Sequence, residues 1–285
     1  MAENQPTSDS EASEPKLKIY FLPNLLTAGN LFCGFVALTK IVEARLDLGD
    51  YTDIKLALAF ILAACIFDLF DGRVARMAGV ESPFGREFDS LADLVSFGVA
   101  PAFLVHRIVL GDVFKEHPQV GWFISSMYLL CGAFRLARFN CLATMPGGGA
   151  NKDFLGFPIP SAAGLVGSVT MLIIHLNEKD RDLGIWKYVP VIVMVLLSAM
   201  MVSTVRYPSF KVLGFRSTST FTKAILAAGI LGGLLVLREK VLFYALPLFF
   251  TVYLIYGFVR PYISRKMRHE IEEADDDDES PKPAN

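Results

Sequence analysis

The chain contains 285 residues, of which 53% are hydrophobic and 20% charged, and its formal net charge is −2. Soluble domains average about 45–50% apolar and about 25% charged residues, so this composition favours a membrane protein. The nearly neutral charge gives no reason to expect nucleic acid as a partner. The four cysteines lie in or beside apolar segments without a C-x-x-C pair, which indicates small buried side chains, with neither disulfides nor a zinc site.

Residues 1–15 lack the basic and apolar regions of a signal peptide, and their polar composition predicts a disordered tail. Beyond them, eight apolar segments approach the about 20 residues that a helix needs to cross a bilayer. These segments are 24–43, 54–73, 91–110, 121–140, 159–176, 188–205, 222–237 and 241–259. The sequence therefore predicts an all-α polytopic membrane protein with about eight spans.

Lysines and arginines are distributed unevenly between the two sets of loops that eight spans would create. With the N-terminus in the cytoplasm, the C-terminus returns there, and the majority of the 27 basic residues fall on the cytoplasmic side. The positive-inside rule therefore predicts a multi-pass protein of the cell (inner) membrane with both termini in the cytoplasm.

Four aspartates mark the ends of two neighbouring apolar segments, at the predicted cytoplasmic face. Asp68 and Asp71 are three residues apart, and Asp89 and Asp93 are four apart, so each pair lies on one face of a helix. The intervening stretch MAGVESPFG contains Gly and Pro, which let the chain turn back and bring the two pairs together. Carboxylates are costly near a bilayer and typically mark ion or substrate sites, and hard divalent cations favour their oxygen atoms.

The residues between the aspartates decide between a site and simple charge pairing. Acidic and basic side chains at membrane ends can pair with one another without any catalytic role. Here, however, Gly72 leaves room for a ligand to approach the backbone, and Arg76 could make a bidentate contact with a phosphate. Two helical pairs of acids interleaved with Gly and Arg favour a phosphate-handling site.

The whole pattern, D-x2-D-G-x2-A-R-x8-G-x3-D-x3-D from Asp68 to Asp93, resembles the signature of the CDP-alcohol phosphotransferase family. The resemblance implies a six-helix membrane core whose members transfer a substituted phosphate from a CDP-linked donor to an alcohol and release CMP. It divides the chain into four parts. These are a tail (1–15), a CDP-alcohol phosphotransferase membrane domain (16–211), an additional transmembrane hairpin (212–262), and a basic collar with an acidic disordered tail (263–285).

Further segments resemble one branch of that family, the bacterial membrane-type phosphatidylserine synthases. They are PNLLTAGNLFCGF at 23–35, EFDSLADLVSFGVAP at 87–101, FRLARFN at 134–140, GFPIPSAAG at 156–164 and MVSTVRYPSFK at 201–211. The resemblance implies CDP-diacylglycerol and L-serine as substrates, the lipid bilayer as surroundings, and a homodimer. Glycerol-3-phosphate or inositol phosphate as the acceptor are alternatives within the family. A cation transporter is disfavoured, because the acids crowd one face and the motif has no second copy.

The same resemblance assigns roles to the aspartates. It implies that Asp68, Asp71, Asp89 and Asp93 hold two divalent metal ions, Mg²⁺ or Mn²⁺. Asp93 also matches the family's general base, which takes the proton of the acceptor hydroxyl. That role agrees with the chemistry, because a hydroxyl is a poor nucleophile until a base removes its proton.

Substrate-binding positions follow from the resemblance as well. Gly72 and Arg76 match the donor-binding positions, and Ser82 matches a hydroxyl in the connecting loop. Asn24 and Thr27 match an element that lines the nucleotide pocket, although Asn24 would also suit a helix N-cap.

Two arginines close the fourth apolar segment at the same face. One of them could hold the carboxylate of serine, and Arg135 is the candidate, but positive-inside anchoring explains Arg135 and Arg138 equally well.

Overall fold

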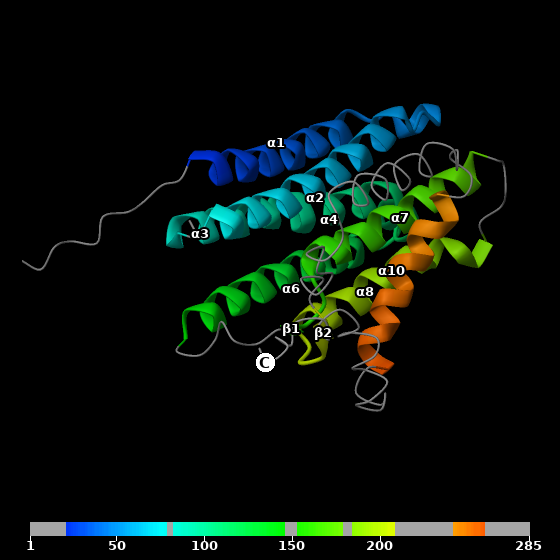
Figure 1. Cartoon of the computed structure of the whole chain (residues 1–285). Coiled ribbons are helices and arrows are strands. Elements are labelled where there is room, and N and C mark those ends of the chain that lie inside the picture. Colours follow the sequence, from blue (N-terminus) through cyan, green and yellow to red (C-terminus); the bar gives the residue numbers. More distant parts are fainter. Residues whose placement is uncertain (1–20, 79–81, 146–152, 179–183, 209–241, 260–285) are drawn as a thin grey trace, which may run out of the picture.

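The computed structural model describes residues 21–78, 82–145, 153–178, 184–208 and 242–259. These residues form a bundle of helices in which α1, α2, α6 and α7 follow a common direction, with α10 running at an angle to them (Figure 1). The predicted span 222–237, both predicted tails and most of the loop 145–153 lie outside the described residues.

The described elements divide into a first half, up to α5, and a second half, from α6 to α10. The first half comprises α1 (Phe21–Glu43), η1 (Leu46–Leu48), α2 (Thr52–Ala78), α3 (Pro83–Asp93), η2 (Leu94–Val99), α4 (Ala100–Val105), η3 (His106–Leu110) and α5 (Gly111–Val113). The second half comprises α6 (Pro118–Thr144), β1 (Asp153–Leu155), α7 (Ile159–Asn177), η5 (Gly184–Tyr188), α8 (Val189–Val202), β2 (Arg206–Pro208) and α10 (Leu242–Val259). The run from α3 to α5 is one continuous helix with two π-helical stretches, η2 and η3.

Five helices are long and apolar enough to cross a membrane, among the residues described. They are Phe21–Glu43, Pro83–Val113, Pro118–Thr144, Ile159–Asn177 and Gly184–Val202. The prediction of a helical polytopic membrane protein is therefore confirmed. Helix α2 is not among the five, and it carries Lys55, Asp68 and Asp71 within its apolar stretch. In α10 the described apolar part, Tyr244–Gly257, is shorter than a full span.

The structure moves several predicted boundaries. The predicted span 91–110 begins at Pro83, because Ser82 caps the helix there and Pro83 suits its first turn. Consequently Asp89 and Asp93 lie inside a helix rather than at its start. The predicted span 188–205 ends at Val202, and the chain then becomes extended.

The described fold is helical, as predicted, except for one short strand pair that the sequence analysis did not predict. Strands β1 and β2 pair antiparallel, with Leu155 opposite Arg206. Gly156, directly after β1, has a φ of +78°, a conformation that suits glycine. Just beyond the strands, Gly156 N donates to Val205 O at 2.8 Å and Phe157 N donates to Met200 O at 3.1 Å.

Three aromatic side chains dock α10 onto this strand pair. The ring centroids of Phe157, Tyr207 and Tyr253 lie 5.2, 5.5 and 5.7 Å apart, and the Tyr207 hydroxyl donates to Leu254 O at 3.3 Å. Such aromatic pairs add stabilisation beyond the area that they bury. The C-terminal helix is thus part of the same folded unit as the rest of the bundle.

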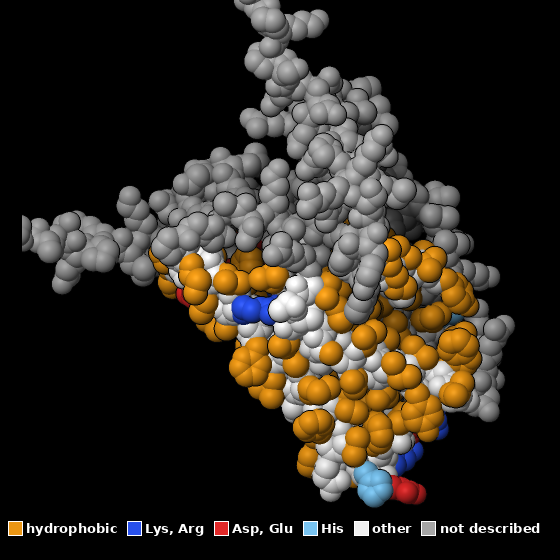
Figure 2. Space-filling model, turned by 90° about the horizontal axis from the view of Figure 1, so that it is seen from below, with side chains coloured by type: hydrophobic (Ala, Val, Ile, Leu, Met, Phe, Trp, Pro, Cys, Tyr) orange, Lys and Arg blue, Asp and Glu red, His pale blue; other side chains and the backbone are white. Residues whose placement is uncertain are grey.

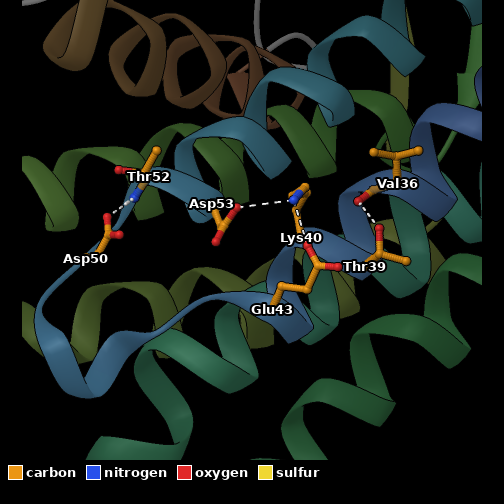
Figure 3. Close-up of polar contacts among 7 residues, drawn as sticks. All are labelled: Val36, Thr39, Lys40, Glu43, Asp50, Thr52 and Asp53. Carbon is orange, nitrogen blue, oxygen red and sulfur yellow. Dashed lines mark hydrogen bonds and ion pairs between the residues drawn. The ribbon is translucent and has the colours of Figure 1, made fainter.

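Polar contacts link the C-terminal end of α1 to the N-terminal end of α2 (Figure 3). Lys40 lies between Glu43 and Asp53, with its Nζ 2.6 and 3.4 Å from their carboxylate oxygens. Asp50 accepts a hydrogen bond from Thr52 N at 2.9 Å, and its contacts with Thr52 lower the pKa of the Asp50 carboxyl. Exposed pairs of this kind add little stability, so this end depends on its helix packing.

Large hydrophobic side chains cover much of the outer surface. Leu25, Phe32 and Phe35 on α1 and Phe123 and Phe134 on α6 are more than half exposed. Figure 2 shows the same for one face, where hydrophobic side chains dominate the described part. Exposed apolar area of this extent is typical of a surface that contacts lipid or another protein.

Close packing between α1 and η2 depends on Gly34. A Cβ atom added there would lie 2.2 Å from Ser96 Oγ and 2.8 Å from Ser96 Cα, so any side chain would push the helices apart. Small residues that allow such close approach are typical of helix contacts in membranes.

We therefore expect Gly34→Ala to destabilise the fold by about 1–3 kcal/mol, the usual penalty of overpacking. Thermal unfolding in detergent measures this. Gly111→Ala is the matched control, because a Cβ there would meet only His106 O at 3.4 Å. Equal unfolding temperatures for the two variants would contradict the proposed packing constraint.

Candidate functional site

Three of the four aspartates converge at one end of the bundle. Asp68 and Asp71 on α2 and Asp89 on α3 each offer a carboxylate oxygen, and these three atoms lie within 4.8 Å of one another. Asp71 is 4% exposed, and the buried Oδ1 of Asp89 has no hydrogen-bond partner among the described residues. Three carboxylates this close repel one another unless cations or protons intervene.

Asp93 stands apart from this cluster but close to it. It lies one turn beyond Asp89, is 7% exposed, and is not among the three converging acids. Its Oδ1 accepts a hydrogen bond from Asn30 Nδ2 at 3.0 Å. Its charge interacts with those of Asp68 and Asp89. The structure thus distinguishes a group of three acids from a fourth that has its own partner.

Helix α1 supplies a hydrogen bond to each of the two helices that carry the acids. Thr27 Oγ1 donates to Asp71 Oδ2 at 2.9 Å, and Asn30 donates to Asp93. Thr27 and Asn30 are three residues apart and buried, so one face of α1 holds both carboxylates. The sequence predicted Thr27 as a substrate contact and missed Asn30. The signal was present, because Asn30 follows Thr27 by one helical turn.

Two further predicted substrate contacts, Ser82 and Asn24, lie near the start of α3. Ser82 is the N-cap of α3, since its Oγ accepts from Gly85 N at 3.0 Å. Asn24 lies inside α1, so the alternative reading of Asn24 as an N-cap was wrong. Its Oδ1 would be 3.4 Å from a Cβ added to Gly85, and its Nδ2 is buried without a described partner. Asn24 and Ser82 are therefore both neighbours of Gly85.

Gly72 is a half-buried residue of α2, next to Asp71. Arg76 belongs to the same helix, but its side chain lies outside the described residues. Its role with the donor phosphate stays a prediction.

The structure separates the two arginines that the sequence could not. Arg138 donates to four backbone carbonyls, those of Val202, Leu155, Met201 and Ser203, at 2.8 to 3.2 Å. It thereby satisfies the carbonyls at the C-terminal end of α8, which have no partner within the helix. This role is structural.

Arg135 has a different environment, although it lies only one turn earlier on α6. It is 6% exposed, and its Nε has no hydrogen-bond partner among the described residues. Its charge interacts with those of Asp93 and Asp68. A buried guanidinium with an unused donor beside acidic groups is suited to bind an anionic ligand.

The π-helix η2 begins directly after Asp93. Tyr128 Oη donates to Phe97 O at 3.1 Å, and Ser96 Oγ donates to Asn30 O at 3.0 Å, so side chains from α6 and η2 secure it. Short π-helical stretches often occur at functional sites, because they re-aim neighbouring side chains.

The model of the CDP-alcohol phosphatidyltransferase family matches residues 20–205. The chain belongs to this family. The matched region contains the three converging aspartates, Asp93 and both residues of α1 that bind them. The family resemblance that the aspartate spacing indicated is therefore confirmed.

Curated relatives point to one branch of the family. A CDP-diacylglycerol–serine O-phosphatidyltransferase of Helicobacter pylori is 35% identical over 85% of this chain and 91% of its own length. The enzyme of the same name from Bacillus subtilis is 32% identical over 67% of this chain and 92% of its own length. An archaetidylserine synthase of Methanothermobacter thermautotrophicus is 32% identical over 66% of this chain and 69% of its own length.

We expect Arg138→Ala to lower the free energy of unfolding by on the order of 1.5–3 kcal/mol, because four carbonyls lose a charged donor. Arg138→Lys should recover only part of this loss, since one ammonium lacks the planar fork. Thermal unfolding of the purified protein measures both. An unchanged unfolding temperature together with a raised KM for the acceptor would instead make Arg138 a substrate ligand.

Proposed function

We propose that this chain is a CDP-diacylglycerol–serine O-phosphatidyltransferase, which transfers the phosphatidyl group of CDP-diacylglycerol to the hydroxyl of L-serine and releases CMP. The names of the relatives in H. pylori and B. subtilis support the substrates. The observation that carries the proposal is the separation of Asp93 from the three converging carboxylates of Asp68, Asp71 and Asp89.

The three converging acids fit a divalent cation. All the donor atoms are carboxylate oxygens, which Mg²⁺ and Mn²⁺ prefer, and the buried Asp89 Oδ1 lacks any described partner. Asp68, Asp71 and Asp89 would hold the cations, and Asp93, one turn beyond Asp89 on α3, would complete a two-ion site. Bound cations would neutralise the donor pyrophosphate and the charge that develops on the leaving CMP.

Asp93 is the general base in this proposal. The hydrogen bond from Asn30 fixes its carboxylate, and its burial keeps competing water away. Asp93 takes the proton of the serine hydroxyl as that oxygen attacks the β-phosphorus of the donor. The new phosphorus–oxygen bond forms while the bond to the CMP oxygen breaks, and the electron pair leaves with CMP.

The remaining residues orient the substrates. Arg135 would bind the carboxylate of serine through its unused donor. Gly72 and Arg76 would approach the phosphates of the donor. Asn24 and Ser82 would line the pocket for its nucleotide. Thr27 is reassigned, because its hydrogen bond makes it a positioning residue for Asp71.

The placement in the membrane belongs to the same proposal. We assign the acidic end to the cytoplasmic face of the inner membrane, with α2, α10 and the segment 222–237 as further spans and a homodimer as the assembly. Basic residues on that side and the apolar outer surface support this placement.

Product identification tests the proposed reaction. Purified protein is incubated with CDP-diacylglycerol, a divalent cation and one acceptor, either L-serine, glycerol-3-phosphate or inositol phosphate. We expect phosphatidylserine and an equal amount of CMP with serine alone. A lipid product with a phosphorylated acceptor instead would place the chain in another branch of the family, and no CMP with any acceptor would remove the enzymatic role.

Substitutions of two acids test the division of labour between them. Asp71→Asn should weaken cation and donor binding, because Asp71 belongs to the converging group. Asp93→Asn keeps the shape of the side chain but removes the base, so CDP-diacylglycerol should bind and turnover should fall by about 100-fold or more. Donor affinity and single-turnover rates measure the two effects. Near-normal turnover by Asp93→Asn would refute the base assignment.

A further inference from the structure

Besides Oδ1 of Asp89, which belongs to the converging acids, two buried polar atoms near Asp93 have no hydrogen-bond partner among the residues that the structure describes. They are Oδ1 of Asn30, a residue that is 0% exposed, and Nε of Arg135. Buried polar groups in folded proteins are nearly always paired, so each unpaired one requires an explanation. A bound substrate that supplies both missing partners is one such explanation.

The orientation of the Asn30 amide follows from its neighbours. Asp93 Oδ1 is an acceptor, so the amide must turn its Nδ2 toward it, at 3.0 Å. The backbone oxygen of the same residue accepts from Ser96 Oγ at 3.0 Å, which holds this part of α1 against η2. The amide oxygen is therefore fixed beside the base as an unused acceptor.

The chemistry of L-serine matches this arrangement. Its ammonium is carried by the carbon next to the one that bears the hydroxyl. When the hydroxyl donates to Asp93, the ammonium comes within reach of a side chain that is itself bonded to Asp93. An ammonium has three donors and no acceptor, so a neutral amide oxygen is a suitable partner. The serine carboxylate then remains for Arg135, whose charge interacts with that of Asp93.

We propose that Asn30 is a specificity-determining residue for the acceptor and that its Oδ1 accepts a hydrogen bond from the α-ammonium of serine. This assignment rests on the proposed function and names the residue that recognises the amino acid. It predicts that an acceptor without an amino group, such as a glycerol phosphate, is disfavoured, since the amide oxygen would stay buried and unpaired.

A pair of acceptors separates recognition from mere positioning. L-Serine and 3-hydroxypropionate share the hydroxyl and the carboxylate, and only serine has the ammonium. The KM for each is measured with wild type, Asn30→Ala and Asn30→Ser, and 3-hydroxypropionate is also titrated as an inhibitor of serine transfer. Binding of CDP-diacylglycerol by each variant shows that the variant is folded.

We expect Asn30→Ala to raise the KM for serine by about 10- to 150-fold, the effect of losing a hydrogen bond to a charged group. The KM or inhibition constant of 3-hydroxypropionate should stay unchanged. Any effect of the lost bond to Asp93 should lower kcat for both acceptors alike. Asn140→Ala is the matched control, because this buried asparagine binds Glu87 and Ser90 rather than Asp93. It should leave the preference for serine over 3-hydroxypropionate as in wild type.

The outcomes distinguish the two proposals. If wild type makes no phosphatidylserine, the proposed function fails and the assignment of Asn30 fails with it. If wild type makes phosphatidylserine and the Asn30 variants raise both constants by the same factor, only the Asn30 assignment is overturned, and the residue merely positions Asp93.

Discussion

Four carboxylates at the end of an apolar helix bundle create the constraint on which the rest of this structure depends. Buried charges are tolerated only when they are hydrogen-bonded, paired or bound to cations. Helix α1 meets part of this requirement with two side chains, Thr27 and Asn30, which donate to Asp71 and Asp93. The remaining charge is gathered where three oxygen atoms lie within 4.8 Å, which suits a divalent cation.

The packing of the helices also helps to provide these carboxylates with hydrogen-bond partners. Gly34 allows α1 to approach η2 closely, and this contact places Asn30 beside Asp93. The π-helical turns after Asp93 are secured by the hydrogen bond from Tyr128 Oη to Phe97 O. Stability and chemistry are therefore coupled in this region, because the small residues that bring the helices together also set the distances between the functional groups.

The sequence predicted that the acids of the two helices meet, because the periodicity of a helix fixes which aspartates share a face and the Gly and Pro between them allow a turn. It did not predict that Asp93 lies outside the converging group of three. It predicted the helical membrane fold from the length of the apolar segments, which approach the about 20 residues that a spanning helix needs. It did not distinguish Arg135 from Arg138. Their roles differ because, within the described residues, only Arg138 donates to backbone carbonyls of α8. Contacts between residues this far apart in the chain leave no pattern in the local sequence. The β1–β2 pairing and the docking of α10 on Tyr207 are equally non-local.

Direct measurement of Mn²⁺ binding tests most directly whether hydrogen bonds from α1 orient the carboxylates to bind a cation. Electron paramagnetic resonance gives the amount of bound Mn²⁺ in the purified protein, and Mg²⁺ is added as a competitor. We expect wild type to bind Mn²⁺ and Thr27→Val to bind it about 10- to 100-fold more weakly, the usual effect of losing a partner that orients a ligand. Wild type that binds no Mn²⁺, or equal affinity in both proteins, would contradict this view of the site.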